Sequence, residues 1–238
     1  MFLEFSNEMK EAARQWSGHP GPPTKFARKR HNGVRMYSSP TAEALLGRVH
    51  PATPLLLFSA PILYGIYRGI STGRLGTTLS LVVAGILFWT LLEYVLHRFP
   101  FHLPMPNKER RLPLFLVHGY HHEYPDDPMR LVAPWPASIS GAALLAGLSY
   151  ASLGGSPLWW PLWAGILVGY VAYDTLHHYT HHARPKHAWG KWLRRYHMEH
   201  HYKDAQSHYG ISSPLWDVVF GTFRAREVEK RALADTQR

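Results

Sequence analysis

Ten histidines in four short clusters constrain this chain more than any other feature of its sequence. The clusters have the patterns H-x4-H, H-x2-H-H, H-x3-H and H-x2-H-H. In chain order they are His97 and His102; His118, His121 and His122; His177 and His181; and His197, His200 and His201. Neutral imidazole is a common metal ligand, and helical residues three or four apart lie on one face. A single pair of histidines is usually a surface or structural feature, but four clusters, each next to an apolar stretch, predict metal binding.

The number of histidines indicates how many metal ions the chain holds. Ten imidazoles are too many for one ion and suit two ions with about five nitrogens each. The chain contains no cysteine, which excludes disulfides and thiolate sites and leaves imidazole and carboxylate as ligands. Pro100 disfavours helix at the residue before it. His97 and His102 are therefore predicted to point in different directions, towards different metals. No catalytic residue is expected beyond the metal ligands.

One carboxylate is placed to support the ligands. Asp174 lies three residues before His177 on the same predicted helix. A carboxylate there can accept a hydrogen bond from an imidazole and so orient the ring beside a metal. Helix capping or a role in topology is the alternative. His178 and His182 point away from the ligand face and are not expected to bind metal.

Four apolar stretches are candidates for membrane-spanning helices: residues 54–70, 75–96, 131–153 and 157–176. A span needs about 20 mostly apolar residues to cross the hydrocarbon of a bilayer. Each half of the chain has two such stretches, then a histidine pair, then a helix with H-x2-H-H. We expect an all-α integral membrane protein with four transmembrane helices as two hairpins, and a cytoplasmic helical cap that holds a histidine-rich di-metal centre. A soluble α-helical protein with buried core helices is the alternative.

The basic residues indicate the topology. Of the 26 Lys and Arg, eight lie in residues 1–53, five in 97–130 and eleven in 177–238. Four spans place these three segments on one side of the membrane, and the positive-inside rule assigns that side to the cytoplasm. We expect a multi-pass protein of a bacterial inner membrane or the endoplasmic reticulum. The positive charge is accounted for by topology, so nucleic-acid binding is not expected.

The termini differ in composition from the rest. Residues 1–37 are polar, basic and interrupted by GHPGPPTK, which predicts a mobile surface segment without a packed core of its own. A short amphipathic helix is expected to begin at Ser39 or Thr41 and to lie at the membrane interface. The membrane domain is predicted over residues 38–226, and residues 227–238 form a charged C-terminal tail.

The placement of the histidines limits the kinds of metal site that the chain can form. The chain has no H-E-x-x-H, the usual pattern of a hydrolytic zinc site. A metal transporter places its ligands near mid-membrane, whereas these lie where the spans leave it. A redox-active di-iron centre acting on membrane lipid is the reading that remains. A desaturase and a non-enzymatic metal-binding or metal-transport membrane protein are the alternatives.

Five motifs resemble those of a known family. They are LEYVLHRFPFH, FLVHGYHHEYPDDPMRLV, GYVAYDTLHHYTHH, YHMEHH and GISSPLWDVVFGTF. Together they are similar to the membrane fatty acid hydroxylase superfamily, which also contains sterol desaturases and methyl oxidases. The first and third histidine boxes are most similar to those of the 2-hydroxylases that act on ceramide or sphingolipid acyl chains. The resemblance covers roughly residues 38–224.

The resemblance implies O2-dependent 2-hydroxylation of a long acyl chain by a non-haem di-iron centre. Two metal ions are implied, Fe(II) for activity with zinc as a possible bound species, and O2 is the co-substrate. One ion would be bound by His102, His118, His121, His177 and His197; the other by His97, His122, His181, His200 and His201. Many members carry an N-terminal haem-binding cytochrome domain, for which residues 1–37 are too short. We therefore expect a separate redox partner of cytochrome or ferredoxin type, besides the membrane lipid substrate.

Overall fold

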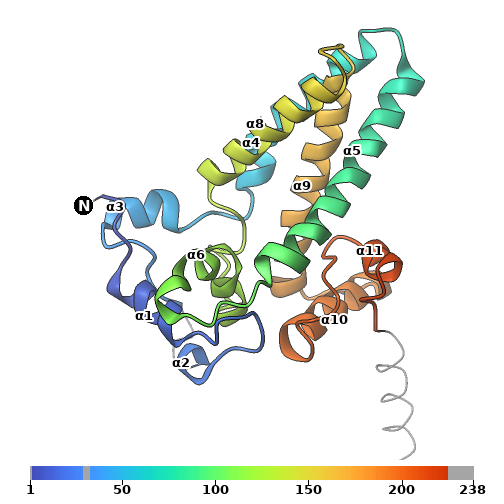
Figure 1. Cartoon of the computed structure of the whole chain (residues 1–238). Coiled ribbons are helices and arrows are strands. Elements are labelled where there is room, and N and C mark those ends of the chain that lie inside the picture. Colours follow the sequence, from blue (N-terminus) through green and yellow to red (C-terminus); the bar gives the residue numbers. More distant parts are fainter. Residues whose placement is uncertain (1, 29–32, 225–238) are drawn as a thin grey trace, which may run out of the picture.

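The computed structural model describes residues 2–28 and 33–224, and in those residues the fold is all-helical. Its β-type pairing there is an isolated bridge between Phe5 and Tyr37. Figure 1 shows two parts, a set of long helices that rise together and a group of short helices at their lower ends. The charged tail predicted at residues 227–238 lies outside the described residues.

The long helices are α4 (Thr53–Ile70), α5 (Leu75–Leu96), α8 (Trp135–Ser152) and α9 (Trp159–His182). They coincide with the four predicted apolar stretches, so the prediction of these helices is confirmed. Short turns join α4 to α5 and α8 to α9, giving two hairpins (Figure 1). Helix α9 packs against each of the other three and is the centre of the bundle.

The membrane-crossing prediction is supported in part. Within the described residues, one helix is long and apolar enough to span a membrane by length and composition. It covers Leu75–Phe101, has a mean hydropathy of 2.0, and is only 22% buried over its most apolar stretch. An unburied apolar helix is unlike the core helix of a soluble protein.

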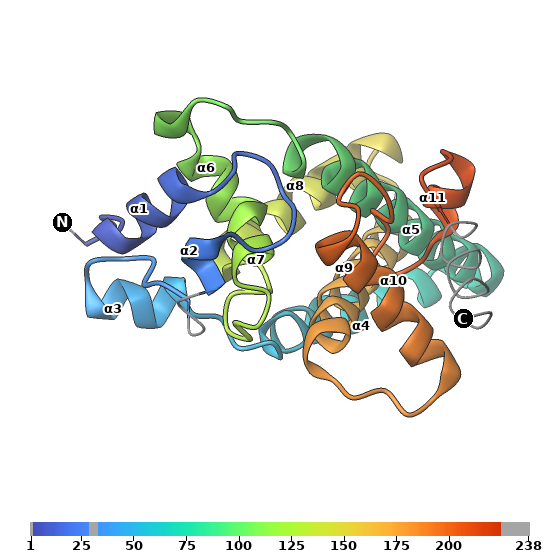
Figure 2. The same ribbon diagram turned by 90° about the horizontal axis from the view of Figure 1, so that it is seen from below.

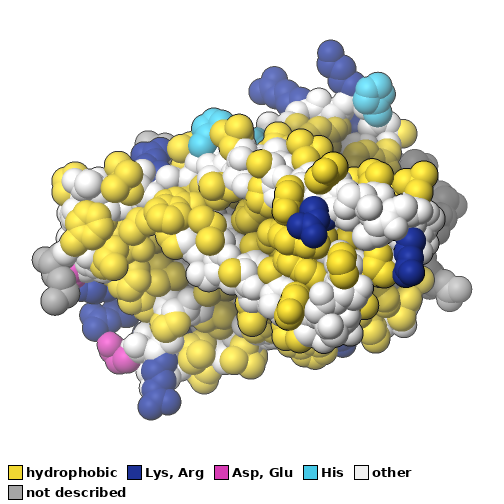
Figure 3. Space-filling view, turned by 90° about the horizontal axis from the view of Figure 1, so that it is seen from above, with side chains coloured by type: hydrophobic (Ala, Val, Ile, Leu, Met, Phe, Trp, Pro, Cys, Tyr) yellow, Lys and Arg dark blue, Asp and Glu magenta, His cyan; other side chains and the backbone are white. Residues whose placement is uncertain are grey.

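The outer faces of the long helices are apolar. Large apolar side chains on three of them are about half exposed or more: Leu55, Leu56, Leu63 and Tyr67 on α4; Leu79, Val83 and Leu87 on α5; Leu144 and Leu148 on α8. Figure 3, which looks down on the free ends of these helices, shows hydrophobic side chains over much of the surface. So much exposed apolar surface indicates contact with lipid.

Helices α5 and α9 cross in close backbone contact. A Cβ atom added to Gly165 of α9 would collide with the backbone of Val82, and one added to Gly85 of α5 would lie 2.7 Å from the amide nitrogen of Ile166. Small residues of this kind let membrane helices approach closely. The crossing fixes the position of His97, at the end of α5, relative to the histidines at the end of α9.

The N-terminal segment is packed, so the prediction of a surface segment without a packed core was wrong. Helix α1 (Asn7–Gln15) buries Met9, Ala12 and Ala13, and Trp16 follows it at 1% exposed. These residues recur at intervals of three and four, which is the stripe of an amphipathic helix. The indole of Trp16 lies against Phe115, with ring centroids 5.7 Å apart.

The segment before α4 is also anchored. Ser39 caps α3 (Pro40–Ala42) by accepting the amide of Ala42, as predicted, and α3 continues into the π-helical turn η1 (Glu43–Gly47). The side chain of Arg130 pairs with Glu43 and Asp127 and donates to the hydroxyl of Tyr120 at 2.6 Å. Such a network of buried, fully partnered charges holds its elements in one geometry.

The remaining short helices carry or flank the histidines. They are α2 (Lys25–Arg28), η2 (His97–Phe101), η3 (Lys108–Arg110), α6 (Leu112–Leu114), η4 (Phe115–Gly119), α7 (Tyr120–Glu123), α10 (Ala188–Tyr202) and α11 (Leu215–Val219). The N-terminal segment is attached to α7, because the carboxylate of Glu123 accepts both the amide and the hydroxyl of Thr24.

The close α5–α9 crossing predicts that Gly165→Leu destabilises the protein. The new side chain would meet the backbone of Val82, which cannot move aside as a flexible side chain can, so we expect a loss of at least about 2 kcal/mol. Gly147→Leu on α8 is the matched control, since a Cβ there meets nothing within 4 Å. Thermal loss of the monodisperse gel-filtration peak measures both, and equal midpoints would show that the crossing is not close.

Candidate metal centre

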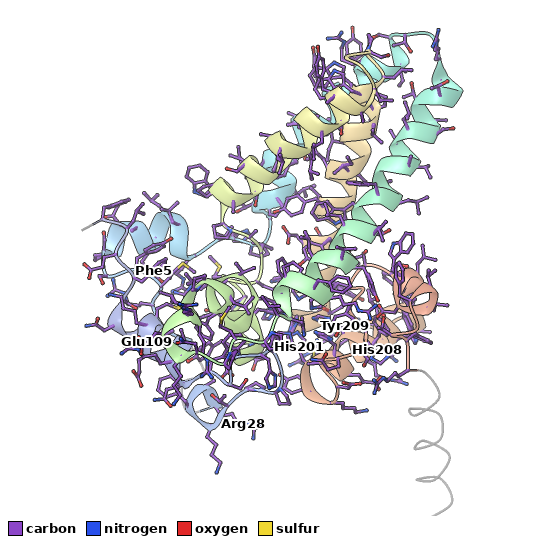
Figure 4. The ribbon with its side chains drawn as sticks, viewed as in Figure 1. Phe5, Arg28, Glu109, His201, His208 and Tyr209 are labelled. Carbon is purple, nitrogen blue, oxygen red and sulfur yellow. The ribbon has the colours of Figure 1, made fainter. Side chains whose placement is uncertain are left out.

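The ten clustered histidines come together beneath the long helices. They are contributed by the end of α5 and η2, by η4 and α7, by the end of α9, and by α10. Figure 2, which views the molecule from below, shows α7, α9 and α10 gathered around this region, and Figure 4 places His201 within it. None of the ten is more than 8% exposed. The structure thus brings the ten histidines that the sequence predicts as ligands into one buried region.

The ring nitrogens fall into two groups. The first group contains His97, His102, His118, His122 and His200, and the second group contains His121, His177, His181, His197 and His201. Within each group, one nitrogen from every residue lies within 4.8 Å of all the others. Five imidazoles around one point are a plausible coordination shell for a transition metal.

The division into these groups differs from the one that the family resemblance implied, which was wrong in this structure. His97 and His102 belong to the same group, and their ring centroids are only 4.9 Å apart. The chain does not break at Pro100 but continues through the π-helical turn η2. A π turn closes between residues five apart, so it returns His102 to the side of His97.

The nitrogen spacing within the second group fits a coordination shell. The Nε2 atom of His121 lies 2.9 Å from Nε2 of both His177 and His201, and Nε2 of His197 lies 2.9 Å from that of His181 and 3.1 Å from that of His201. One ring nitrogen offers a single proton or a single lone pair, so it cannot bond well to two such neighbours. Metal–nitrogen bonds of about 2.1 Å at right angles put adjacent nitrogens about 3 Å apart.

The first group has the same character. Nε2 of His118 lies 3.1 Å from Nε2 of His97 and 3.0 Å from Nε2 of His122. Nε2 of His200 is buried without a hydrogen-bond partner in the described part of the chain. An unpaired buried nitrogen costs about 1–3 kcal/mol, and a bound metal ion would remove that cost.

Burial keeps the imidazoles uncharged. Burial, together with a smaller effect of nearby imidazoles, lowers the pKa of His121 and of His200 to about 3. The pKa values of His118 and His201 are also well below the usual range for the same reasons. Neutral rings with free lone pairs are the form that binds metal.

The carboxylate of Asp174 does not orient an imidazole, contrary to the prediction. Nε2 of His177 faces His121, and its Nδ1 has no hydrogen-bond partner among the described residues. Asp174 instead lies in the wall of a cavity together with Tyr170 and Tyr173. Its Oδ2 atom is buried and unpaired in the described structure.

That cavity has a volume of about 740 Å³ and touches both histidine groups. His118 of the first group and His121 and His177 of the second group line it. It continues between the long helices, where its walls are apolar and include Leu92 of α5 and Leu145 of α8. The cavity was not predicted from the sequence, because its walls come from elements far apart in the chain.

Among the histidines outside the two groups, His178 and His182 were not expected to bind metal, and the buried position of His208 was not predicted. His178 and His182 contact each other, with ring centroids 4.7 Å apart and ring planes tilted by 34°, and belong to neither group. His208 is buried beside Tyr196, with ring centroids 4.6 Å apart. Nothing in its spacing from the other histidines indicates this position.

Removing His121 should therefore empty at least the second group. Its Nε2 has two neighbouring ligand nitrogens, so His121→Ala deletes one bond and leaves the others around a gap. Metal per chain, measured by inductively coupled plasma mass spectrometry, should fall by at least one ion. His178→Ala is the matched control and should keep the full complement; unchanged metal in His121→Ala would contradict the site.

Comparison with known proteins gives a consistent result. The chain is 40% identical over 193 residues to a dihydroceramide fatty acyl 2-hydroxylase of Arabidopsis thaliana, which covers 80% of each chain. It is 42% identical over 148 residues to a ceramide very long chain fatty acid hydroxylase of Saccharomyces cerevisiae, covering 60% of this chain and 38% of the yeast protein. It is 33% identical over 220 residues to human fatty acid 2-hydroxylase, covering 79% and 56%.

The fold is also that of a solved structure. Full-length Scs7p, in which only the hydroxylase domain is visible, superposes with a TM-score of 0.76 at 30% identity, covering 94% of this chain and 82% of that one. The family profile described as fatty acid hydroxylase matches residues 82–222, which contain all ten clustered histidines. The chain belongs to the fatty acid hydroxylase family.

Proposed function

We propose that this protein catalyses the O2-dependent 2-hydroxylation of a long fatty acyl chain, carried in ceramide or another sphingolipid. The observation that carries the proposal is the cavity, which joins both histidine groups to an apolar space between the long helices. The relatives named above act on ceramide, dihydroceramide or fatty acids, and this agrees with the shape and lining of the cavity.

The ten histidines of the two groups are the proposed metal ligands, and two iron ions in the Fe(II) state are the proposed active cofactor, with zinc a possible bound species. The donor set supports this, since imidazole accepts iron, zinc and copper alike. When bound, the iron pair supplies the activation of O2 that insertion into a C–H bond requires. The balance of hydroxylation is one O2, two electrons and two protons for each hydroxyl group and water formed.

The walls of the cavity supply the positioning. An acyl tail lying along Leu92 and Leu145 stays in an apolar environment, as it does in the bilayer, whereas drawing it out into water would cost about 0.8 kcal/mol for each CH2 exposed. The carbonyl end then lies beside His118, His121 and His177. C2 is the carbon next to that carbonyl, so this placement favours attack at C2 over attack at mid-chain carbons.

Polar side chains in the wall can hold the head of the lipid. The buried Oδ2 atom of Asp174 has no hydrogen-bond partner in the described residues. This oxygen can accept a hydrogen bond from an amide N–H or a hydroxyl group of the lipid. The hydroxyl groups of Ser138 and Tyr170 lie 2.7 Å apart in the same wall. These groups suit a lipid whose carbonyl end carries a hydrogen-bond donor, as an amide-linked chain does.

We further propose that α4, α5, α8 and α9 all cross the membrane and that the histidine centre lies at its cytoplasmic face. The apolar outer faces of these helices and the distribution of basic residues support this topology. The membrane hydroxylase domain is proposed over residues 38–226, with the N-terminal segment packed onto it. Electrons are proposed to come from a separate redox protein of cytochrome or ferredoxin type.

The function is tested by expressing the chain in a host that lacks 2-hydroxylated lipids, together with a reductase system, under labelled O2. We expect lipid mass spectrometry to find one labelled oxygen at C2 of long acyl chains, and none in a His177→Ala variant with equal expression. A new double bond, an oxidised sterol, or no oxygen-dependent product from metal-loaded protein would contradict the proposal.

A further inference from the structure

Two backbone carbonyl groups hold imidazoles of the first group. Nδ1 of His97 donates to the carbonyl oxygen of Tyr209 at 2.5 Å, and Nδ1 of His200 donates to that of Ser207 at 2.7 Å. A ring that donates through Nδ1 keeps its lone pair on Nε2 and is fixed in direction. In the described structure, Nδ1 has no hydrogen-bond partner in His122 of the first group or in three residues of the second group, His177, His197 and His201.

The two carbonyl groups belong to one irregular loop, residues 203–214, between α10 and α11. His208 lies between Ser207 and Tyr209, whose carbonyl oxygens accept these hydrogen bonds, and its φ of 58° is in the left-handed region that non-glycine residues rarely adopt. Such a conformation is strained and persists only where its surroundings hold it. Figure 4 shows His208 and Tyr209 close to the lower end of α5.

Asp217 of α11 holds the loop from one side. Its carboxylate accepts the amide of Tyr209 at 2.9 Å and the amide of Gly210 at 2.7 Å. It also accepts the hydroxyl groups of Tyr196 at 2.5 Å and Thr222 at 2.6 Å. The residue is fully buried, and a carboxylate, which only accepts, matches four donors in a way that asparagine cannot.

Glu93 of α5 holds the loop from the other side. It accepts the amides of Ile211 at 2.5 Å and Ser212 at 2.8 Å, and the hydroxyl of Ser212 at 2.6 Å. Glu93 lies four residues before His97 on one helix, so the two share a face. The helix that supplies His97 therefore also binds the loop that orients it.

The same relation is repeated on α10. Tyr196 lies four residues before His200 and donates to Asp217, which in turn binds the loop. Each of the two helices thus carries a ligand and, one turn earlier, a side chain that fixes the loop against that ligand. Both ligands that are held in this way, His97 and His200, belong to the first group.

We propose that Glu93, Asp217 and Tyr196 are positioning residues for the metal site of the first group, acting through the carbonyl groups of Ser207 and Tyr209. The proposal rests on the proposed di-metal centre. It implies that the two metal sites are not equivalent, because the loop orients two ligands of the first group, whereas Nδ1 of three second-group ligands has no hydrogen-bond partner among the described residues.

The test counts the metal ions of the purified full-length chain during exposure to excess chelator. Asp217→Asn places an amide N–H2 among four donors, so the loop should shift and one ion should leave roughly 10–100-fold faster than from the unaltered chain. The second ion should leave at its unaltered rate. Tyr196→Phe removes one donor without adding another, and it should show the same selectivity with a smaller acceleration.

Ligand variants identify the site that is affected. In a His200→Ala background, which already disrupts the first group, Asp217→Asn should change the remaining ion's release little. In a His197→Ala background, which disrupts the second group, Asp217→Asn should accelerate loss of the remaining ion. The reverse pattern would overturn the assignment to the first group.

Glu43→Gln is the matched control for a structural effect. Glu43 is also a buried carboxylate that accepts two successive backbone amides, those of Met36 at 2.8 Å and Tyr37 at 3.0 Å, but it contacts no loop residue. Glu43→Gln should lower the thermal midpoint without accelerating the release of one metal ion over the other. The positioning role is wrong if Asp217→Asn lowers the thermal midpoint as Glu43→Gln does but leaves the release rates of both metal ions unchanged. It is also wrong if Asp217→Asn accelerates the release of both ions equally.

The outcomes also separate this proposal from the proposed function. Selective release in Asp217→Asn, with no hydroxylated product from the unaltered protein, would support positioning and overturn the proposed reaction. Fewer than two ions in the unaltered chain would overturn both.

Discussion

Ten uncharged imidazoles crowded into a buried volume require an acceptor for their lone pairs. Within the second group, three of the five ring nitrogens each face two others at 2.9–3.1 Å. Hydrogen bonds between the rings can satisfy only some of these contacts, because each nitrogen has one proton or one lone pair. Two metal ions, one for each group, would satisfy all of them and would thereby stabilise the folded cap.

The rest of the fold brings these rings together from distant parts of the chain. The close crossing of α5 and α9 sets the ends of two helices side by side, and both ends carry ligands. The N-terminal segment packs on η4 and α7, which carry three more. The cavity opens from the same place into the apolar space between the long helices. The histidine groups and the apolar cavity are therefore adjacent in the structure.

The features that could be predicted from the sequence are those with local periodicity. The ranges of the four long helices follow from unbroken apolar runs, and the ten histidines follow from intervals of three to five. The division of the histidines could not be predicted, because it depends on a π turn through Pro100 that keeps His97 and His102 together. Glu93 and Asp217 carry no local signal, since the amides they bind lie far along the chain or in an irregular loop. The packing of Met9 and Trp16 was obscured by the charged residues around them.

The central claim is that each five-histidine group holds one metal ion, and diffraction from crystals of the iron-loaded protein tests it most directly. Data collected on both sides of the iron absorption edge should give two anomalous peaks. One should lie among His97, His102, His118, His122 and His200, and the other among His121, His177, His181, His197 and His201. A single peak, or a peak with His97 and His102 on different ions, would contradict the account.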